Sequence, residues 1–296
     1  METGLFIGVD LAWAQQGGTK PNETGVAAID RTGTVIDCGW TFGTEETLEW
    51  ILRTAGGRPG LAFVDAPLVV DNPTGQRLCE REVGQRYGRW KVSANSTNQG
   101  SPRLAGLDLR KRLEAAGWTY DDGRDGPPSD GRFFSECYPY TTLVGAAELG
   151  YDQERPRYKR PLRGVPAAVW QEARARECDG LIARLHGLAT ARPPLLLDSH
   201  EDSGRLLAEP SPRKSVDYKH REDLIDALLC AWTASLWAHH GLARCQVLGA
   251  TTPHPPGHAP TIIARPARSS GGTGARTRPR CVRTERPAPS RPPPPN

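Results

Sequence analysis

The segment KHREDLIDALLCAWTASLWAHHG, residues 219–241, constrains the fold more than any other stretch of this chain. Between Leu224 and Ala238 it carries one charged residue, Asp226. A helix that is apolar on nearly all sides is buried, so other elements have to cover this one. Asp223 and Asp226 are three residues apart and therefore share a helix face. A buried carboxylate needs a metal, a base or a proton as its partner.

Asp226 is the more informative of these two carboxylates. Asp217 has the residue type of an N-cap, which places Asp226 beyond the first helical turn. The helix dipole, which favours acidic residues in the first turn, therefore explains Asp223 better than Asp226. We interpret Asp226 as a functional residue and leave both interpretations open for Asp223.

The first 70 residues have the pattern of a mixed sheet. Residues 5–13 and 60–70 are short apolar runs of strand length, and residues 24–42 read as two strands joined at a turn containing Gly33. Residues 45–57 show helical spacing and end in glycines. Short connections favour an antiparallel meander, and the helix suits a crossover to a parallel fourth strand.

The rest of the chain adds to this core. We expect an inserted region of loops and helices over about 71–131, with residues 77–90 as its best helix, and a fifth strand over 133–143. Residues 166–188 resemble one or two amphipathic helices, and late strands are expected at 244–250 and 260–266. The predicted fold is α/β, a mixed five-stranded sheet flanked by helices, in one domain over 1–268.

Residues 269–296 have a different composition, rich in Arg, Pro, Gly and Ser, that predicts a disordered tail. This segment holds six Arg and one Glu, which leaves 32 basic and 33 acidic residues in the body. The sequence pI of about 8.7 therefore comes from the tail and does not indicate a basic face on the domain.

The remaining composition indicates a globular protein without a membrane segment. Charged residues make up 24% of the chain and apolar residues 37%. No apolar run has the length of a bilayer span, and the N-terminus lacks the pattern of a signal peptide, so we expect a cytoplasmic protein. The seven cysteines form no C-x-x-C pair, which argues against a disulfide framework or a zinc site.

Asp10 and Asp65 each follow an apolar strand run, F-I-G-V-D and A-F-V-D. Buried strands rarely carry a charge in the middle, so both residues should lie at carboxyl-terminal strand ends, where α/β sheets bind ligands. Neighbouring strands would direct both carboxylates into one crevice, together with Asp223 and Asp226. Oxygen-only ligands suit Mg²⁺ or Mn²⁺, which can support phosphodiester hydrolysis.

Several other residues are weaker candidates. Glu136, within an aromatic strand pattern, is either a further metal ligand or the partner of a buried Arg. Arg77 and Arg81 could clamp a phosphate, although such residues more often form a solvated helix face or ion pairs. Lys159 could face substrate phosphates, but exposure to solvent is the simpler expectation. His220 could assist proton transfer, although a partly exposed histidine is the simpler interpretation.

Basic residues surround Tyr87 and Trp90, as in proteins that bind single strands, although both aromatic residues could equally belong to the core.

The motifs G-V-D-L-A-W, F-V-D-A-P-L, R-x-C-E-R, S-E-C-Y-P and D-L-I-D-A-L-L-C-A-W occur in this order over residues 5–266. Together they resemble domain-of-unknown-function family 429, whose members are described as predicted nucleases of the RNase H-like fold. The segment K-H-R-E-D-L-I-D-A-L is also similar to the last catalytic helix of RuvC-type Holliday-junction resolvases.

The resemblance implies an RNase H-like domain and catalytic roles for Asp10, Asp65, Asp223 and Asp226. Asp65 stands where the resolvases have a glutamate, a side chain one methylene longer. The resemblance also implies Mg²⁺ or Mn²⁺ as cofactor and nucleic acid, DNA or RNA, as partner.

Three functions follow from these observations. The first is a metal-dependent nuclease or related phosphodiesterase. The second is a nucleotide phosphotransferase of the actin-like fold, which would need a second phosphate-binding hairpin and a glycine-rich adenosine site. The third is a non-catalytic module that binds nucleic acid or protein.

Overall fold

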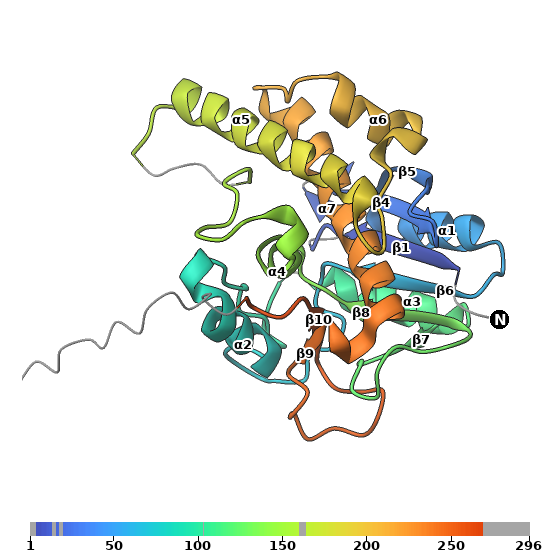
Figure 1. Ribbon diagram of the computed structural model, residues 1–296. Helices are drawn as coiled ribbons and strands as arrows, with labels where there is room; N and C mark the ends of the chain where they lie inside the picture. The colour runs from blue at the N-terminus through green and yellow to red at the C-terminus, as the bar shows by residue number, and fades with distance from the viewer. Residues whose placement is uncertain (1–3, 14–15, 18–19, 103, 160–163, 269–296) are drawn as a thin grey trace, which may run out of the picture.

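A computed structural model describes residues 4–13, 16–17, 20–102, 104–159 and 164–268 (Figure 1). The tail over 269–296, for which disorder was predicted, lies outside the described residues. Among the described helices, none combines the length and the hydropathy that a bilayer span requires.

The centre of the molecule is a six-stranded mixed sheet with the strand order β5-β4-β1-β6-β8-β7. β4 pairs antiparallel with β1 and β5, whereas β1, β6, β8 and β7 run parallel to one another. Its strands are β1 (Leu5–Asp10), β4 (Glu23–Asp30), β5 (Val35–Phe42), β6 (Gly60–Val64), β7 (Thr119–Tyr120) and β8 (Arg132–Glu136). The mixed α/β sheet is as predicted, with the short β7 as a sixth strand.

The expected hairpin between β4 and β5 forms around Gly33, whose φ of 82° suits glycine. The Asp30 carboxylate accepts hydrogen bonds from the backbone N–H groups of Thr32 and Thr34, at 2.8 and 3.0 Å, and so closes the turn.

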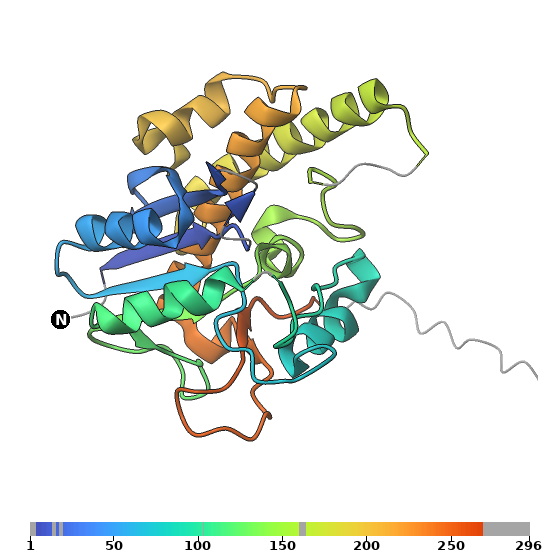
Figure 2. The same cartoon turned by 180° about the vertical axis from the view of Figure 1, so that it is seen from behind.

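Helices cover both faces of the sheet. Figure 2 shows α1 (Gly43–Ala55) and α3 (Ala105–Ala115) side by side on one face. On the other face, α7 (Ser215–His240) crosses the sheet, with α4 (Pro139–Gly145), α5 (Ala167–His186) and α6 (Glu201–Ala208) around it (Figure 1). α2 (Leu78–Tyr87) lies beside β9 (Gln246–Leu248) and β10 (Ile262–Ala264), which form a separate pair.

The sheet has a hydrophobic core on each face because side chains alternate along its strands. On β1, Leu5, Ile7 and Val9 pack with residues of α1 and α3, whereas Phe6 packs in the cluster that contains the buried side of α7. This arrangement explains why β1 reads as a continuous apolar run.

Two glycines let α7 lie directly on the central strands. A Cβ added at Gly8 of β1 would lie 1.9 Å from the carbonyl oxygen of Ala227, and one added at Gly25 of β4 would lie 2.2 Å from that of Asp223. The helix backbone therefore touches the strand backbones. This contact fixes the acidic turn of α7 over the end of β1.

Two local predictions need correction. The strand predicted over 133–143 ends at Glu136, because Pro139 starts α4. Asp217 is not the N-cap of α7: the helix begins at Ser215, after Lys214. The late strands predicted over 244–250 and 260–266 form as β9 and β10, which pair with each other, and Cys137, after β8, makes one bridge to Ile263.

Candidate metal centre

The site lies where two parallel strands end. Asp10 is the last residue of β1, and Asp65 directly follows β6. The two strands are paired with Val9 opposite Val64, and the Asp65 N–H donates to the carbonyl oxygen of Val9 at 2.8 Å. The register therefore brings the two aspartates together at one edge of the sheet.

The third carboxylate comes from α7. Asp226 is fully buried, and Asp10, Asp65 and Asp226 each offer a carboxylate oxygen such that the three atoms lie within 4.8 Å of one another. Three segments that are far apart in sequence thus contribute to one oxygen cluster. Such a set of hard ligands suits a divalent cation of the Mg²⁺ or Mn²⁺ type.

Asp223 belongs to the rim of this cluster. It is buried one turn before Asp226, and it forms an ion pair with Lys219. Burial raises its pKa to about 9, and the interaction with Asp10 adds to this increase. It is not one of the three residues whose oxygen atoms form the close group.

Burial first, and then the neighbouring charge of Asp10, raise the pKa of Asp65 to about 8. Removing carboxylates from water while placing them beside each other disfavours their ionised forms. Positive charge nearby relieves this repulsion, and Lys159 acts in that direction on Asp65.

Two residues of one loop hold Asp226. The Tyr158 hydroxyl donates to Asp226 Oδ1 at 2.5 Å, and the Lys159 ammonium forms an ion pair with Oδ2. Although burial disfavours the charged form of Lys159, the surrounding carboxylates, Asp10 above all, raise its pKa. Lys159 is therefore part of the site, and the expectation of a solvent-exposed side chain was wrong.

The buried oxygens of the cluster are incompletely satisfied. Asp223 Oδ2 and Asp226 Oδ2 accept no hydrogen bond from the described residues, and Asp226 Oδ2 has the ion pair with Lys159 alone. Buried polar atoms normally have partners, so these oxygens have capacity for another ligand. The donor set and the remaining capacity of these oxygens fit a divalent cation.

The cluster opens into a cavity of about 350 Å³. Asp10 and Asp65 lie at its acidic end, and its charged lining also includes Lys91, Arg155, Lys159 and Lys219. Of these four cations, Lys91, Lys159 and Lys219 each form an ion pair with a carboxylate, of Glu154, Asp226 and Asp223 respectively.

Glu136 lies outside the cluster. Arg77 donates two hydrogen bonds to its carboxylate, at 2.6 and 2.7 Å, and a third to Glu80 at 2.9 Å. Glu136 also accepts the N–H of Leu68 at 3.0 Å. The alternative of a buried arginine partner is therefore the correct one for Glu136, and the role of Arg77 is an ion pair rather than a phosphate clamp.

The remaining candidates lie elsewhere or in the core. Arg81 is exposed on α2. His220 Nδ1 lies 2.8 Å from a carboxylate oxygen of Glu23, and His220 does not line the cavity. Tyr87 and Trp90 are buried, at 0% and 1% exposure, so they belong to the core and cannot form a stacking platform.

Sequence reasoning missed Lys219 and Tyr158 as members of this site. Lys219 could have been found, because it precedes Asp223 by four residues on the same helix. Tyr158 gave no comparable signal, since its position beside Asp226 depends on a loop that is 68 residues away in sequence.

A family model matches residues 8–252, and its description is "Protein of unknown function (DUF429)". The matched range includes the three clustered aspartates. No curated protein and no solved structure matches the chain.

Proposed function

Because this chain belongs to the DUF429 family, whose description assigns no activity, we propose its function from the site: metal-dependent hydrolysis of phosphodiester bonds in nucleic acid. The observation that carries the proposal is the convergence of Asp10, Asp65 and Asp226 within 4.8 Å at one end of a cavity rich in lysine and arginine. Clustered carboxylates suit a cation, and the basic lining suits a phosphate chain.

The proposal includes an RNase H-like fold. An antiparallel meander of β1, β4 and β5, followed by a helical crossover to parallel β6 and β8, supports it. So does the position of the carboxylates, since the central strand β1 carries the first, its parallel neighbour leads to the second, and the late helix α7 supplies the third.

Each residue has a role in this proposal. Asp10, Asp65 and Asp226 hold the cation, and Tyr158 orients Asp226 through its hydroxyl group. A divalent cation held there would supply Lewis-acid activation of water and of phosphoryl oxygens. Lys159 and Lys219 supply positive charge beside the phosphates, while Asp223 holds the Lys219 ammonium in place.

The test is cleavage of fluorescent single strands, duplexes, DNA–RNA hybrids and branched junctions with Mg²⁺, Mn²⁺ or EDTA. Cleavage should require the cation, and Asp10→Asn should lower the rate at least about a hundredfold, equivalent to roughly 2.7 kcal/mol of transition-state stabilisation. The exposed Asp198 provides a matched control, and Asp198→Asn should cleave normally. Full activity of Asp10→Asn would refute the proposal, as would absence of cleavage in every combination.

One observation favours a second candidate. Lys159 and Lys219 already pair with Asp226 and Asp223, so the cluster is partly neutralised by the protein itself. A non-catalytic module that binds nucleic acid without a cation would have this property. Equal binding in EDTA and in Mn²⁺, without cleavage, would support that module.

A further inference from the structure

The cavity beside the carboxylates has an aromatic wall that the proposed chemistry does not use. Trp13, Tyr138 and Tyr140 line it together with the charged residues. Trp13 and Tyr138 are half-buried, whereas Tyr140 is buried. Two aromatic rings therefore remain partly accessible beside the three clustered carboxylates.

Hydrogen bonds hold these rings in place. The Trp13 indole N–H donates to the carbonyl oxygen of Asp65 at 3.1 Å, which ties the ring to a proposed metal ligand. The Tyr138 hydroxyl donates to the carbonyl oxygen of Ser93 at 3.1 Å, and its ring packs edge-on against Tyr140 with centroids 5.7 Å apart. Fixed aromatic faces lose little entropy when a flat group stacks on them.

Cationic groups are interleaved with this wall. The Arg155 guanidinium lies 4.6 Å from the ring centroid of Tyr140 and donates to its hydroxyl at 3.0 Å. The Lys159 ammonium lies 5.6 Å from the same centroid. Proteins that bind single-stranded nucleic acid combine aromatic stacking surfaces with positive charge in this way.

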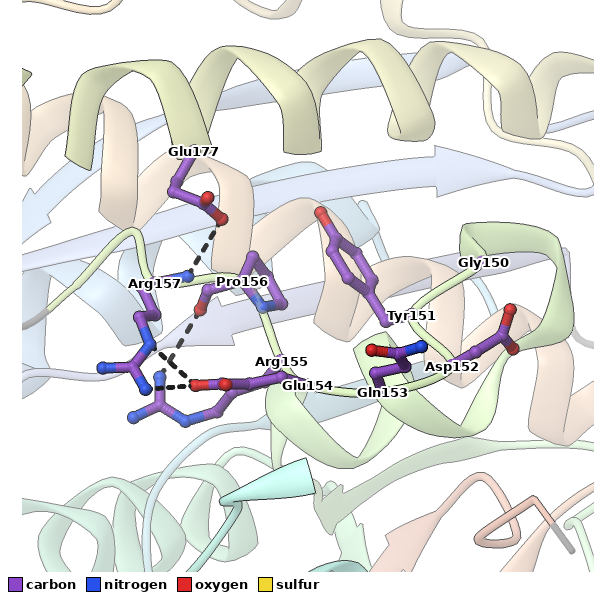
Figure 3. A pocket seen from close by; sticks show the side chains of 9 residues that line it. All are labelled: Gly150, Tyr151, Asp152, Gln153, Glu154, Arg155, Pro156, Arg157 and Glu177. Carbon is purple, nitrogen blue, oxygen red and sulfur yellow. Dashed lines mark hydrogen bonds and ion pairs between the residues drawn. The ribbon is translucent and has the colours of Figure 1, made fainter. Parts of the chain in front are cut away.

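The basic lining does not continue into the neighbouring hollow. Arg155 also borders a neighbouring hollow of about 460 Å³ (Figure 3), where the acidic residues Asp152, Glu154 and Glu177 outnumber Arg155 and Arg157. Arg157 is held there by Glu154, at 2.7 Å from its Nε, and its backbone N–H donates to Glu177. This hollow therefore disfavours a polyanion on that side of the cavity.

The position of the carboxylates argues against an intact duplex. Asp65 is only 8% exposed and lines the cavity, so a phosphodiester has to enter the cavity to reach it. A cavity of about 350 Å³ is at the small end of ligand pockets. Enzymes that take a base into a recessed pocket act on single strands or on nucleotides that have left the base stack, and a nucleotide entering this cavity needs the same freedom.

We infer that this site takes an unpaired nucleotide of a single-stranded nucleic acid, with the base stacked on Trp13 or Tyr138 and the phosphate directed to Lys159 and the carboxylates. The inference rests on the proposed function, because it names the substrate class of the same site. It applies to DNA and RNA alike, since stacking uses the face of any base.

Binding can be measured separately from cleavage. Fluorescence anisotropy of the full chain with a labelled 12-nucleotide single strand and with the blunt duplex of the same sequence, in DNA and in RNA, would be recorded in EDTA and in Ca²⁺. The single strand should bind at least about tenfold more tightly. A duplex that binds equally well or better would overturn the inference.

Aromatic variants locate the binding surface. Trp13→Leu should weaken single-strand binding on the order of tenfold, whereas Trp13→Phe, which keeps a ring, should retain most of it. Tyr138→Leu and Tyr138→Phe form a second pair that does not depend on the folding of the Trp13 variants. The control is Trp170→Leu on α5, outside the cavity. Equal losses in the control and the cavity variants would overturn the inference.

The outcomes for the two proposals differ. Single-strand preference that depends on Trp13, without cleavage under any condition, would support the substrate class and refute the hydrolase. Cation-dependent cleavage with a preference for intact duplex would support the hydrolase and refute the substrate class.

Discussion

Glu136 and Asp226 are both carboxylates in apolar segments, yet their surroundings give them different roles. Glu136 is neutralised by a guanidinium that donates two hydrogen bonds to it, so its buried charge is compensated within the protein. Asp226 has a tyrosine hydroxyl and an ammonium group, and it lies beside two further carboxylates. The first arrangement holds a loop together, whereas the second leaves room for a ligand.

Replacing Arg77 tests the structural role of this pair. Arg77→Met should destabilise the protein by about 3–5 kcal/mol, because Glu136 and Glu80 would remain buried without a cation. Urea unfolding followed by tryptophan fluorescence measures this change. Adding Glu136→Gln to Arg77→Met should restore part of the lost stability.

The matched control for Arg77 lies four residues along the chain. Arg81 is exposed, so Arg81→Met should change the free energy of unfolding by no more than about 0.5 kcal/mol. Similar effects of the two arginine variants would contradict a structural role for the Arg77 pair.

At the scale of elements, the contact between α7 and the central strands determines where the acidic turn lies. The strand-end positions of Asp10 and Asp65 could be predicted, because a carboxylate after an apolar run has few other places. The close approach at Gly8 and Gly25 could not, since a glycine in a strand also suits a bulge or a bend. The position of Asp226 over β1 therefore could not be predicted, because it depends on the contact of α7 with strands that are distant in sequence.

Gly8→Ala should be far more damaging than a glycine replacement on an open helix face. Its Cβ would lie 1.9 Å from a carbonyl oxygen of α7, so the helix has to move, and we expect a loss of at least about 3 kcal/mol. Gly84 in α2 has no atom within 4 Å of an added Cβ, so Gly84→Ala should stabilise by about 0.5–1 kcal/mol. Thermal unfolding of both variants measures these changes in stability. If Gly8→Ala caused no loss of stability, α7 would not lie against β1 as described.

At the scale of the whole molecule, the α/β layers can be predicted from the sequence more completely than the set of residues that form the site. Apolar periodicity and strand-end aspartates lead to a mixed sheet with a buried helix, and the structure has both. Lys159 and Tyr158 enter the site through a loop, and loop conformation leaves no periodic signal in sequence. The sixth strand, β7, has only two residues, too few for a pattern to indicate it.

Cation binding should be measurable as a change in the stability of the whole fold. A ligand that binds only the folded state at a hundred times its Kd stabilises that state by about 2.7 kcal/mol. Mn²⁺ should therefore raise the Tm of the protein by several degrees, because the three carboxylates come together only when β1, β6 and α7 are assembled. Asp226→Asn should lose most of this increase, whereas the exposed-site variant Asp198→Asn should keep it. If Mn²⁺ raised the Tm of Asp226→Asn as much as that of the unchanged protein, the cation would bind elsewhere, and the cluster would have no role in holding it.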